Sequence, residues 1–322
     1  MSLVSHLLVF LLSIGVVWFF AGVLLDTVGR ISMRLCRSGF GTAFFLLGFL
    51  TSISEISVAM NAGIAGVPGV SAGNLVGASF VILLLIVPFL AVAGNGISLK
   101  GLVSKEMLAF TLLVVLLPVL LLADGRVTML EGAFAVLAYA ALAYSIRNRP
   151  EATETNVCIP EAAGGKRGLL IDTGKILLSA GAIFVASHFL VEQTVEVARL
   201  IDVPSSLIGL ILLSVGTNIP EIVIAVRAVL EKRKDIAFGD YLGSAAANVP
   251  IFGMLALLSG GFVVESSEFV ASALLMFVGF TAFYFFARSR SILSRREGVA
   301  LLLFYGVFLA IQFVNLARFA VS

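Results

Sequence analysis

Residues 47–55 read Leu-Gly-Phe-Leu-Thr-Ser-Ile-Ser-Glu, and residues 213–221 read Leu-Ser-Val-Gly-Thr-Asn-Ile-Pro-Glu. Each segment places a glutamate, Glu55 or Glu221, deep inside an apolar stretch that is long enough to cross a bilayer. An ionised carboxylate in hydrocarbon costs about 2.5 to 3.5 kcal/mol on insertion scales. Two such residues at equivalent positions indicate a cation that compensates their charge near the membrane midplane.

The composition around these segments is that of an integral membrane protein. Of the 322 residues, 60% are hydrophobic and 12% are charged, and the mean hydropathy is +1.12. Such a chain has too little polar surface to fold as a water-soluble globule. Apolar runs of about 20 residues predict an all-α fold with ten transmembrane helices. We expect these spans near residues 3–25, 38–62, 69–93, 107–123, 127–146, 169–191, 204–230, 236–260, 264–287 and 298–318.

The positions of the basic residues predict the orientation of the chain. Most of its 21 Lys and Arg residues lie in the loops after the first, third, fifth, seventh and ninth predicted spans. Because basic loops stay in the cytoplasm, both termini are predicted to be extracytoplasmic. The expected location is the inner membrane of a cell, as a multi-pass protein.

The ten expected spans fall into two groups of five, so the second half should be inverted relative to the first. We expect a first repeat over residues 1–146, a cytoplasmic linker over 147–168 and a second repeat over 169–322. A shift of 166 residues supports this division, because it places residues 47–77 over residues 213–243 without a gap. The informative matches are polar residues and glycines: Thr51 with Thr217, Glu55 with Glu221, Gly73 with Gly239, and Gly77 with Gly243.

The second segment has the composition of an interrupted helix. Pro220 donates no N–H, and its ring crowds the carbonyl group of Gly216. Carbonyl groups released in this way can coordinate a cation. Thr217 and Asn218 add a hydroxyl and a carboxamide oxygen on the turn before Glu221, and hard oxygen ligands of this kind suit calcium or sodium.

The first segment keeps the threonine and the glutamate but has no proline. We expect its helix to be disrupted less, or to be disrupted by Gly48 together with the hydroxyl groups of this segment.

A polar face runs along the helix predicted after the second segment. Asp240, Ser244 and Asn248 recur every four residues, so they lie on one side of this helix. Lipid would require that side to be apolar, and we expect it to face Glu221 or a water-filled path. Asp240 has two possible roles, which are to handle a cation or proton and to serve as a structural cap. The equivalent face of the first half is nearly bare, and its residues are Asn74, Ala78 and Ile82. Close helix packing explains the glycines of both turns equally well.

The two Thr-x-x-x-Glu segments, each followed 18 residues later by a Gly-Asn/Asp-x-x-Gly turn, resemble the paired alpha-repeats of the cation/calcium exchanger superfamily. The resemblance covers essentially the whole chain. It implies antiport of calcium, or a related divalent cation, against sodium by alternating access, with no cofactor. The metal ligands that it implies are Glu55, Glu221, Thr51 and Thr217 for calcium, and Ser52, Asn218, Ser244 and Asn248 for flanking sodium ions, with Asp240 as a further candidate.

The chain departs from the superfamily pattern in the helices that follow the two segments. Ala78 and Ile82 stand where the first repeat normally has polar ligands, and Asp240 stands where the second usually has asparagine. Two carboxylates balance one calcium ion or two sodium ions, so the stoichiometry or the coupling ion can differ from the usual sodium-driven case. Exchange of calcium for protons stays open, because a buried carboxyl group can carry a proton when no cation is bound. The Gly-Asn-Ala-x-Glu-His signature of proton-coupled relatives is absent.

Other classes of protein fit less well. An intramembrane hydrolase would need a catalytic set or a metal motif, whereas His6 and His188 lie in different spans and the sequence contains no His-Glu-x-x-His, so we expect no enzyme. A cation channel could use the same acidic site but would pass current without a counter-ion. A purely structural protein leaves the duplicated acids unexplained. The expected partners are calcium and sodium ions, with protons as the alternative, and the lipid bilayer. We expect no nucleic acid, and a monomer is the working expectation.

Overall fold

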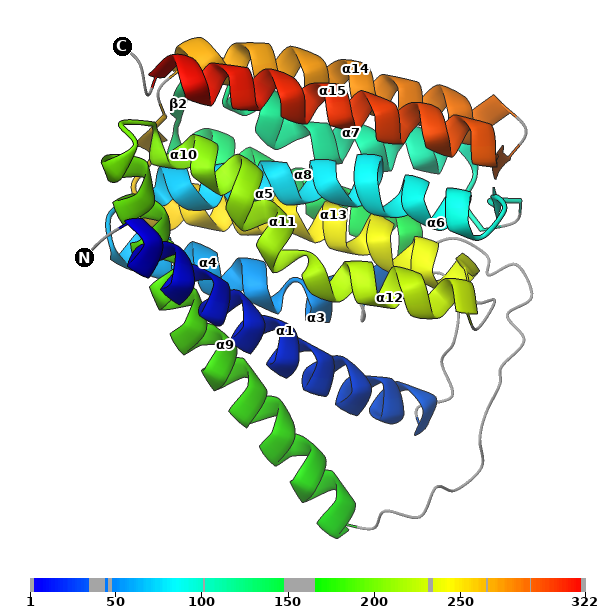
Figure 1. Cartoon of the computed structure of the whole chain (residues 1–322). Coiled ribbons are helices and arrows are strands. Elements are labelled where there is room, and N and C mark those ends of the chain that lie inside the picture. The colour runs from blue at the N-terminus through cyan, green and yellow to red at the C-terminus, as the bar shows by residue number, and fades with distance from the viewer. Residues whose placement is uncertain are drawn as a thin grey trace.

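The computed structural model describes residues 3–34, 44–45, 48–100, 102–147, 166–230, 234–264, 266–289 and 291–319. Most of these residues are helical, and the long helices form one bundle (Figure 1). Helix α1 (Leu3–Arg34) begins at one end of the bundle, and helix α15 (Arg295–Phe319) ends at the same end.

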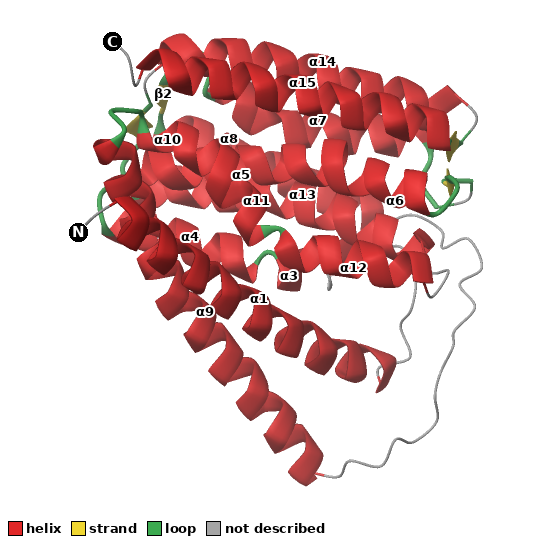
Figure 2. Ribbon diagram, viewed as in Figure 1, coloured by secondary structure: helices red, strands yellow, loops and turns green. Residues whose placement is uncertain are grey.

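The remaining helices follow in chain order. They are α3 (Gly48–Thr51), α4 (Ile53–Ile64), α5 (Pro68–Val81), the π-helix η2 (Ile82–Ile86), α6 (Val87–Ala93), α7 (Lys105–Leu121), α8 (Met129–Arg147), α9 (Lys166–Leu200), α10 (Ser205–Ile208), the π-helix η3 (Gly209–Leu213), α11 (Ser214–Thr217), α12 (Ile219–Leu230), α13 (Lys234–Leu258) and α14 (Ser266–Ser289). Four two-residue strands pair antiparallel in loops at the two ends of the bundle (Figure 2): β1 (Ile97–Ser98) with β4 (Ile292–Leu293), and β2 (Arg126–Val127) with β3 (Phe262–Val263).

The helices have the length and composition of membrane spans. Within the described residues, seven helical segments are long and apolar enough to cross a membrane. The spans predicted at 38–62, 107–123 and 204–230 fall on helices that are interrupted or shorter. The protein is therefore a multi-pass membrane protein with a mostly helical fold.

Two helices extend well past the predicted apolar runs. The spans predicted at 3–25 and 169–191 correspond to α1, which continues to Arg34, and α9, which runs from Lys166 to Leu200. Hydropathy locates the part of a helix that lies in hydrocarbon, whereas the backbone can stay helical where polar side chains reach water. The predicted linker 147–168 lies outside the described residues except at its ends, where α8 finishes and α9 starts.

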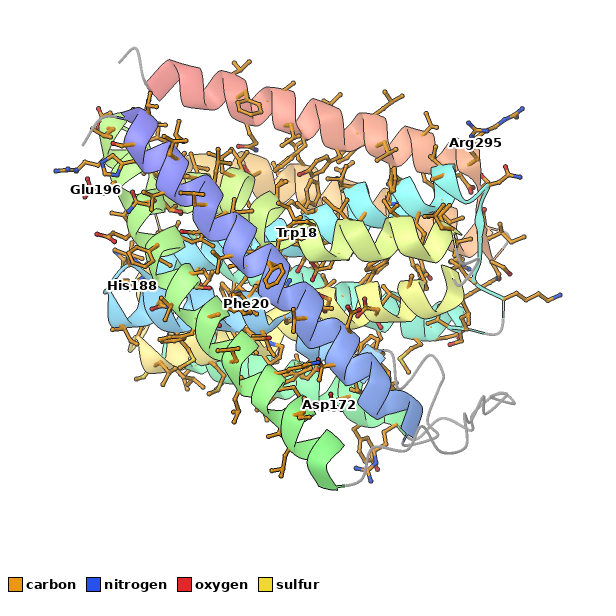
Figure 3. All side chains as sticks on the ribbon, turned by 60° about the horizontal axis from the view of Figure 1, so that its bottom comes forward. Trp18, Phe20, Asp172, His188, Glu196 and Arg295 are labelled. Atoms are coloured by element: carbon orange, nitrogen blue, oxygen red, sulfur yellow. The ribbon has the colours of Figure 1, made fainter. Side chains whose placement is uncertain are left out.

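The bundle has an inner layer and an outer layer. The segment Pro68–Ala93, which joins α5, η2 and α6, is 83% buried, and Ala237–Leu258 of α13 is 78% buried. The other membrane-span segments are at most 33% buried. Helices α1 and α9 pack against each other and run obliquely across one side of the bundle, with exposed apolar side chains such as Trp18 (Figures 1 and 3).

Glycines allow the inner helices to approach their neighbours at backbone distance. A Cβ atom on Gly77 of α5 would run into the carbonyl oxygen of Leu210, and a Cβ atom on Gly243 of α13 would run into the carbonyl oxygen of Phe44. Gly77 and Gly243 are 166 residues apart, as are Phe44 and Leu210. The same close crossing is thus made twice by residues that the sequence shift relates, and close packing explains these two glycines.

A further glycine crossing, between α8 and α13, tests the packing away from the acidic residues. A Cβ atom on Gly253 would lie 2.5 Å from the carbonyl oxygen of Gly132 and 2.8 Å from Cγ2 of Val136. We expect Gly253→Ala to lower the free energy of unfolding by about 1 to 3 kcal/mol, the usual cost of overpacking. The measurement is the midpoint of thermal unfolding in detergent. Gly181→Ala on α9, where a Cβ atom meets nothing within 4 Å, is the control and should not lower this midpoint. A Gly253→Ala protein as stable as wild type would refute the crossing.

Candidate cation site

Two helices in the interior are broken at equivalent residues. Ser52 separates α3 from α4 with φ −77° and ψ 7°, and Asn218 separates α11 from α12 with φ −92° and ψ 9°. These residues are 166 positions apart. The helix of the first segment is thus interrupted at the same place as that of the second, although it has no proline.

Side chains replace the backbone hydrogen bonds that are lost at these breaks. The hydroxyl groups of Ser52 and Thr51 donate to the carbonyl oxygen of Gly48 at 2.8 and 3.2 Å. Nδ2 of Asn218 donates to the carbonyl oxygen of Ser214 at 2.7 Å. Gly48 and Ser214 are again related by the sequence shift. The first segment was expected either to be disrupted less or to be disrupted by Gly48 and the hydroxyl groups. The structure agrees with the second expectation.

Glu55 and Glu221 lie in the first turn after each break and are almost completely buried, with exposed fractions of 1% and 0%. The hydroxyl of Ser54 donates to Oε2 of Glu55 at 2.7 Å. Oε1 of Glu55 and both carboxylate oxygens of Glu221 have no hydrogen-bond partner in the described structure. Because an ionised carboxylate without a counter-charge is very costly in an apolar interior, these oxygens are suited to bind a cation.

The two glutamates lie in one electrostatic neighbourhood. Glu221 is close enough to Glu55 and to Asp240 to be repelled by both when they are charged. The hydroxyl of Thr217 lies beside the carboxyl group of Glu55 and donates to Oδ1 of Asn74 at 3.3 Å. Negative charge and neutral oxygen atoms therefore gather where the two broken helices meet.

Further buried oxygen atoms lie at the two helix breaks and along α13. The hydroxyl oxygens of Ser52 and Ser244 are 3.5 Å apart, which brings α13 against the first break. Oδ1 of Asn218, Asp240 and Asn248 are all buried, and none has a hydrogen-bond partner in the described structure. Unpaired buried acceptors are rare because each costs about 1 to 3 kcal/mol, so this concentration of them is a property expected of a site for a positive ligand.

Not all the residues singled out from the sequence gather in one centre. Among the described residues, no three His, Cys, Asp or Glu side chains form a group that could hold a metal ion. Asp240 is thus a neighbour of Glu221 but does not complete a three-acid cluster. His6 lies apart from the acids, and its Nδ1 is 2.6 Å from Oε1 of Gln193. A cation held here would rely on two carboxylates and on neutral oxygens.

Sequence reasoning missed three residues that contact the site. Ser54 was not singled out because its equivalent is Pro220, which has no hydroxyl. Tyr241 donates its hydroxyl to the carbonyl oxygen of Glu221 at 3.1 Å. Ser79 supplies a hydroxyl from α5 beside the nearly bare face. Asn74, the polar residue expected on that face, accepts from Thr217. A search for every polar residue within an apolar span, instead of matched pairs only, would have found them.

Comparison with known proteins shows which family this chain resembles. A family model described as "Sodium/calcium exchanger protein" matches residues 5–146 and 172–314. The sodium/calcium exchanger MaX1 of Methanosarcina acetivorans is 32% identical over 147 residues, which cover 45% of this chain and 42% of that protein, so the match spans less than half of that relative's length.

Two solved structures share the fold. The sodium-calcium exchanger NCX_Mj aligns with a TM-score of 0.67 and 19% identity, covering 95% of this chain and 97% of the other. The H⁺/Ca²⁺ exchanger CAX aligns with a TM-score of 0.77 and 17% identity, covering 98% of this chain and 86% of the other.

The carboxylate oxygens without hydrogen-bond partners predict how buried charge affects thermal stability. We expect Glu55→Gln and Glu221→Gln each to raise the midpoint of thermal unfolding in calcium-free buffer, because an amide removes an uncompensated buried charge. Calcium should stabilise the wild type, by about 2.7 kcal/mol at 100 times its dissociation constant, but not the variants. Glu196→Gln, which alters an exposed ion pair with Arg199 (2.6 Å), is the matched control and should respond to calcium like the wild type. Equal stabilisation of all four proteins would show that the ion does not bind at these acids.

Proposed function

Because the chain belongs to the sodium/calcium exchanger family, we propose that it is a secondary active antiporter that exchanges calcium, or a related divalent cation, for sodium by alternating access. The observation that carries this proposal is the pair of buried glutamates, Glu55 and Glu221, beside two broken helices. Three of their four carboxylate oxygens have no hydrogen-bond partner in the described structure. A site with two negative charges accepts one divalent or two monovalent cations at similar electrostatic cost. Competition between one divalent cation and two monovalent cations for this site is the basis of exchange.

We assign the divalent ion to Glu55 and Glu221, together with oxygens at Thr51 and Thr217. The support is that both acids are buried and that the Thr217 hydroxyl lies beside Glu55. Carboxylate, hydroxyl and carbonyl oxygens are the ligands that calcium prefers.

Flanking sodium ions are assigned to a second group of oxygens, which lies around the divalent site. Ser244 supports this assignment through its contact with Ser52, and Asn218 and Asn248 do so through their unpartnered Oδ1 atoms. The flanking ligands are Ser52, Asn218, Ser244 and Asn248. Asp240 adds negative charge next to Glu221 and is the remaining candidate ligand.

The architecture that we propose is ten transmembrane helices in two inverted five-helix repeats, over residues 1–146 and 169–322. The equivalent helix breaks and the equivalent glycine crossings, each separated by 166 residues, support it. Alternating access would follow from sliding of α1 and α9, which pack together on one side of the bundle, across the other helices (Figure 3).

The orientation proposed for this architecture places both termini outside the cytoplasm in the inner membrane. We expect Asp124→Cys to react with a membrane-impermeant thiol reagent on intact cells, and Lys100→Cys to react only after permeabilisation, both in a background without native cysteines. Both residues are exposed in loops at opposite ends of α7. The reverse labelling pattern would invert the orientation.

Exchange of calcium for protons is the second candidate. It is favoured by Asp240, a third buried acid beside Glu221, and by the absence of polar side chains at Ala78 and Ile82. A carboxyl group that is buried without a cation can be neutralised by a proton instead.

Calcium flux into proteoliposomes separates these functions. We expect radioactive calcium to enter vesicles loaded with sodium but not vesicles loaded with potassium. Glu55→Gln and Glu221→Gln should reduce uptake to background, because each removes one of the two carboxylates assigned to the divalent ion. Glu196→Gln is the control and should transport like the wild type. Uptake driven by a pH gradient alone would establish proton coupling, and calcium current without a counter-ion would establish a channel. Wild-type-like transport by either glutamine variant would overturn the site.

A further inference from the structure

Ser79 of α5 is a buried serine whose hydroxyl joins the two inner helices. Its Oγ is 3.2 Å from the carbonyl oxygen of Leu75, 3.3 Å from the carbonyl oxygen of Ala245 on α13, and 3.1 Å from Nδ2 of Asn248. Both Ser79 and Asn248 are almost completely buried, with exposed fractions of 4% and 1%.

These three contacts determine how the amide of Asn248 is oriented. A carbonyl oxygen only accepts hydrogen bonds, and the Ser79 hydroxyl has a single proton. That proton goes to the carbonyl oxygen of Leu75 or Ala245, so the lone pairs of Oγ accept from Asn248. The NH₂ group of Asn248 must therefore face Ser79. The opposite orientation would place two carbonyl oxygens and Oδ1 around one proton and would lose a hydrogen bond.

The orientation leaves Oδ1 of Asn248 as a free ligand. This oxygen is buried and has no hydrogen-bond partner in the described structure. Ser244 lies one turn earlier on the same face of α13, and its Oγ is 3.5 Å from that of Ser52 at the first helix break. An oriented, unpartnered carboxamide oxygen on the face that meets the break is suited to coordinate a cation.

We propose that Ser79 is a positioning residue, which holds the amide of Asn248 so that Oδ1 is presented to a monovalent cation in a flanking subsite. The proposal rests on the proposed function and deepens it, because it names the residue that makes this subsite competent. A residue that orients a cation ligand through a hydrogen bond typically changes the cation affinity by about 10- to 100-fold.

The pairing of a serine with an asparagine, as in Ser79 and Asn248, is not repeated at the positions that the sequence shift relates to these two residues. The sequence shift pairs Asn248 with Ile82 and Ser79 with Ala245, and neither Ile82 nor Ala245 has a polar side chain. Ile82 is fully buried, so the equivalent position in the first half offers no oxygen to an ion. The chain thus has one subsite of this type where a symmetric protein would have two.

The test compares sodium and calcium titrations of purified protein and of proteoliposomes. Binding is read from the midpoint of thermal unfolding as NaCl replaces choline chloride at constant ionic strength, and transport from sodium-driven calcium uptake. We expect Ser79→Ala to raise the half-saturating sodium concentration by about 10-fold or more in both assays, with the calcium dependence unchanged. Ser79→Thr keeps the hydroxyl and should retain the wild-type sodium dependence.

Ser71→Ala is the matched control, because Ser71 is a buried serine two turns earlier on α5 whose hydroxyl has no hydrogen-bond partner in the described structure. It should leave both titrations unchanged. Asn248→Ala should raise the half-saturating sodium concentration as Ser79→Ala does. The double variant of Ser79 and Asn248 should be no worse than Asn248→Ala alone, because Ser79 acts through Asn248.

Three outcomes would overturn the proposal. They are an unchanged sodium titration of Ser79→Ala, an equal loss of calcium and sodium affinity, and additive effects in the double variant. If Ser79→Ala does not fold, a wild-type sodium titration of Asn248→Ala overturns it as well. If the wild type transports and one of these outcomes is found, only the role of Ser79 is refuted. If the wild type neither binds nor exchanges calcium and sodium, the proposed function itself is refuted.

Discussion

The structure depends on one electrostatic constraint: two carboxylates lie buried together inside a membrane protein, and an ionised group in that position must meet a positive charge. Glu55 and Glu221 are almost fully buried, and three of their four carboxylate oxygens lack a hydrogen-bond partner among the described residues. Leaving such groups uncompensated would cost several kcal/mol each. In the function that we propose, a bound cation is the compensating group.

The helix breaks follow from the same requirement. A continuous helix would use every backbone carbonyl internally and would present only side chains to an ion. At Ser52 and Asn218 the helix stops for one residue, and the side chains bond back to the carbonyl oxygens of Gly48 and Ser214. The first break forms without a proline, and the Ser52 hydroxyl bonds to the carbonyl that is equivalent to the one bonded by Asn218 in the second half. Close glycine crossings bring α5 and α13 within reach of the two breaks.

The two halves share a backbone plan but not a set of polar side chains. Ser54 donates to Glu55, whereas the equivalent Pro220 cannot donate to Glu221. Asn74 accepts from Thr217, and its equivalent is the acid Asp240. Such differences make the two halves unequal in charge and in the polar side chains that lie near Glu55 and Glu221.

Most of the fold could be predicted from the sequence, because the cost of polar groups in hydrocarbon makes apolar runs visible and makes two buried acids conspicuous. The sequence by itself determined the membrane class, the helical fold and the equivalence of Glu55 with Glu221. Only the tertiary structure decided that Ser52 breaks its helix as Asn218 does, and that Ser79 reaches Asn248 across α5 and α13. The physical reason is that hydropathy and periodicity report on single helices, whereas a hydrogen bond between helices depends on how closely and at which rotation they pack.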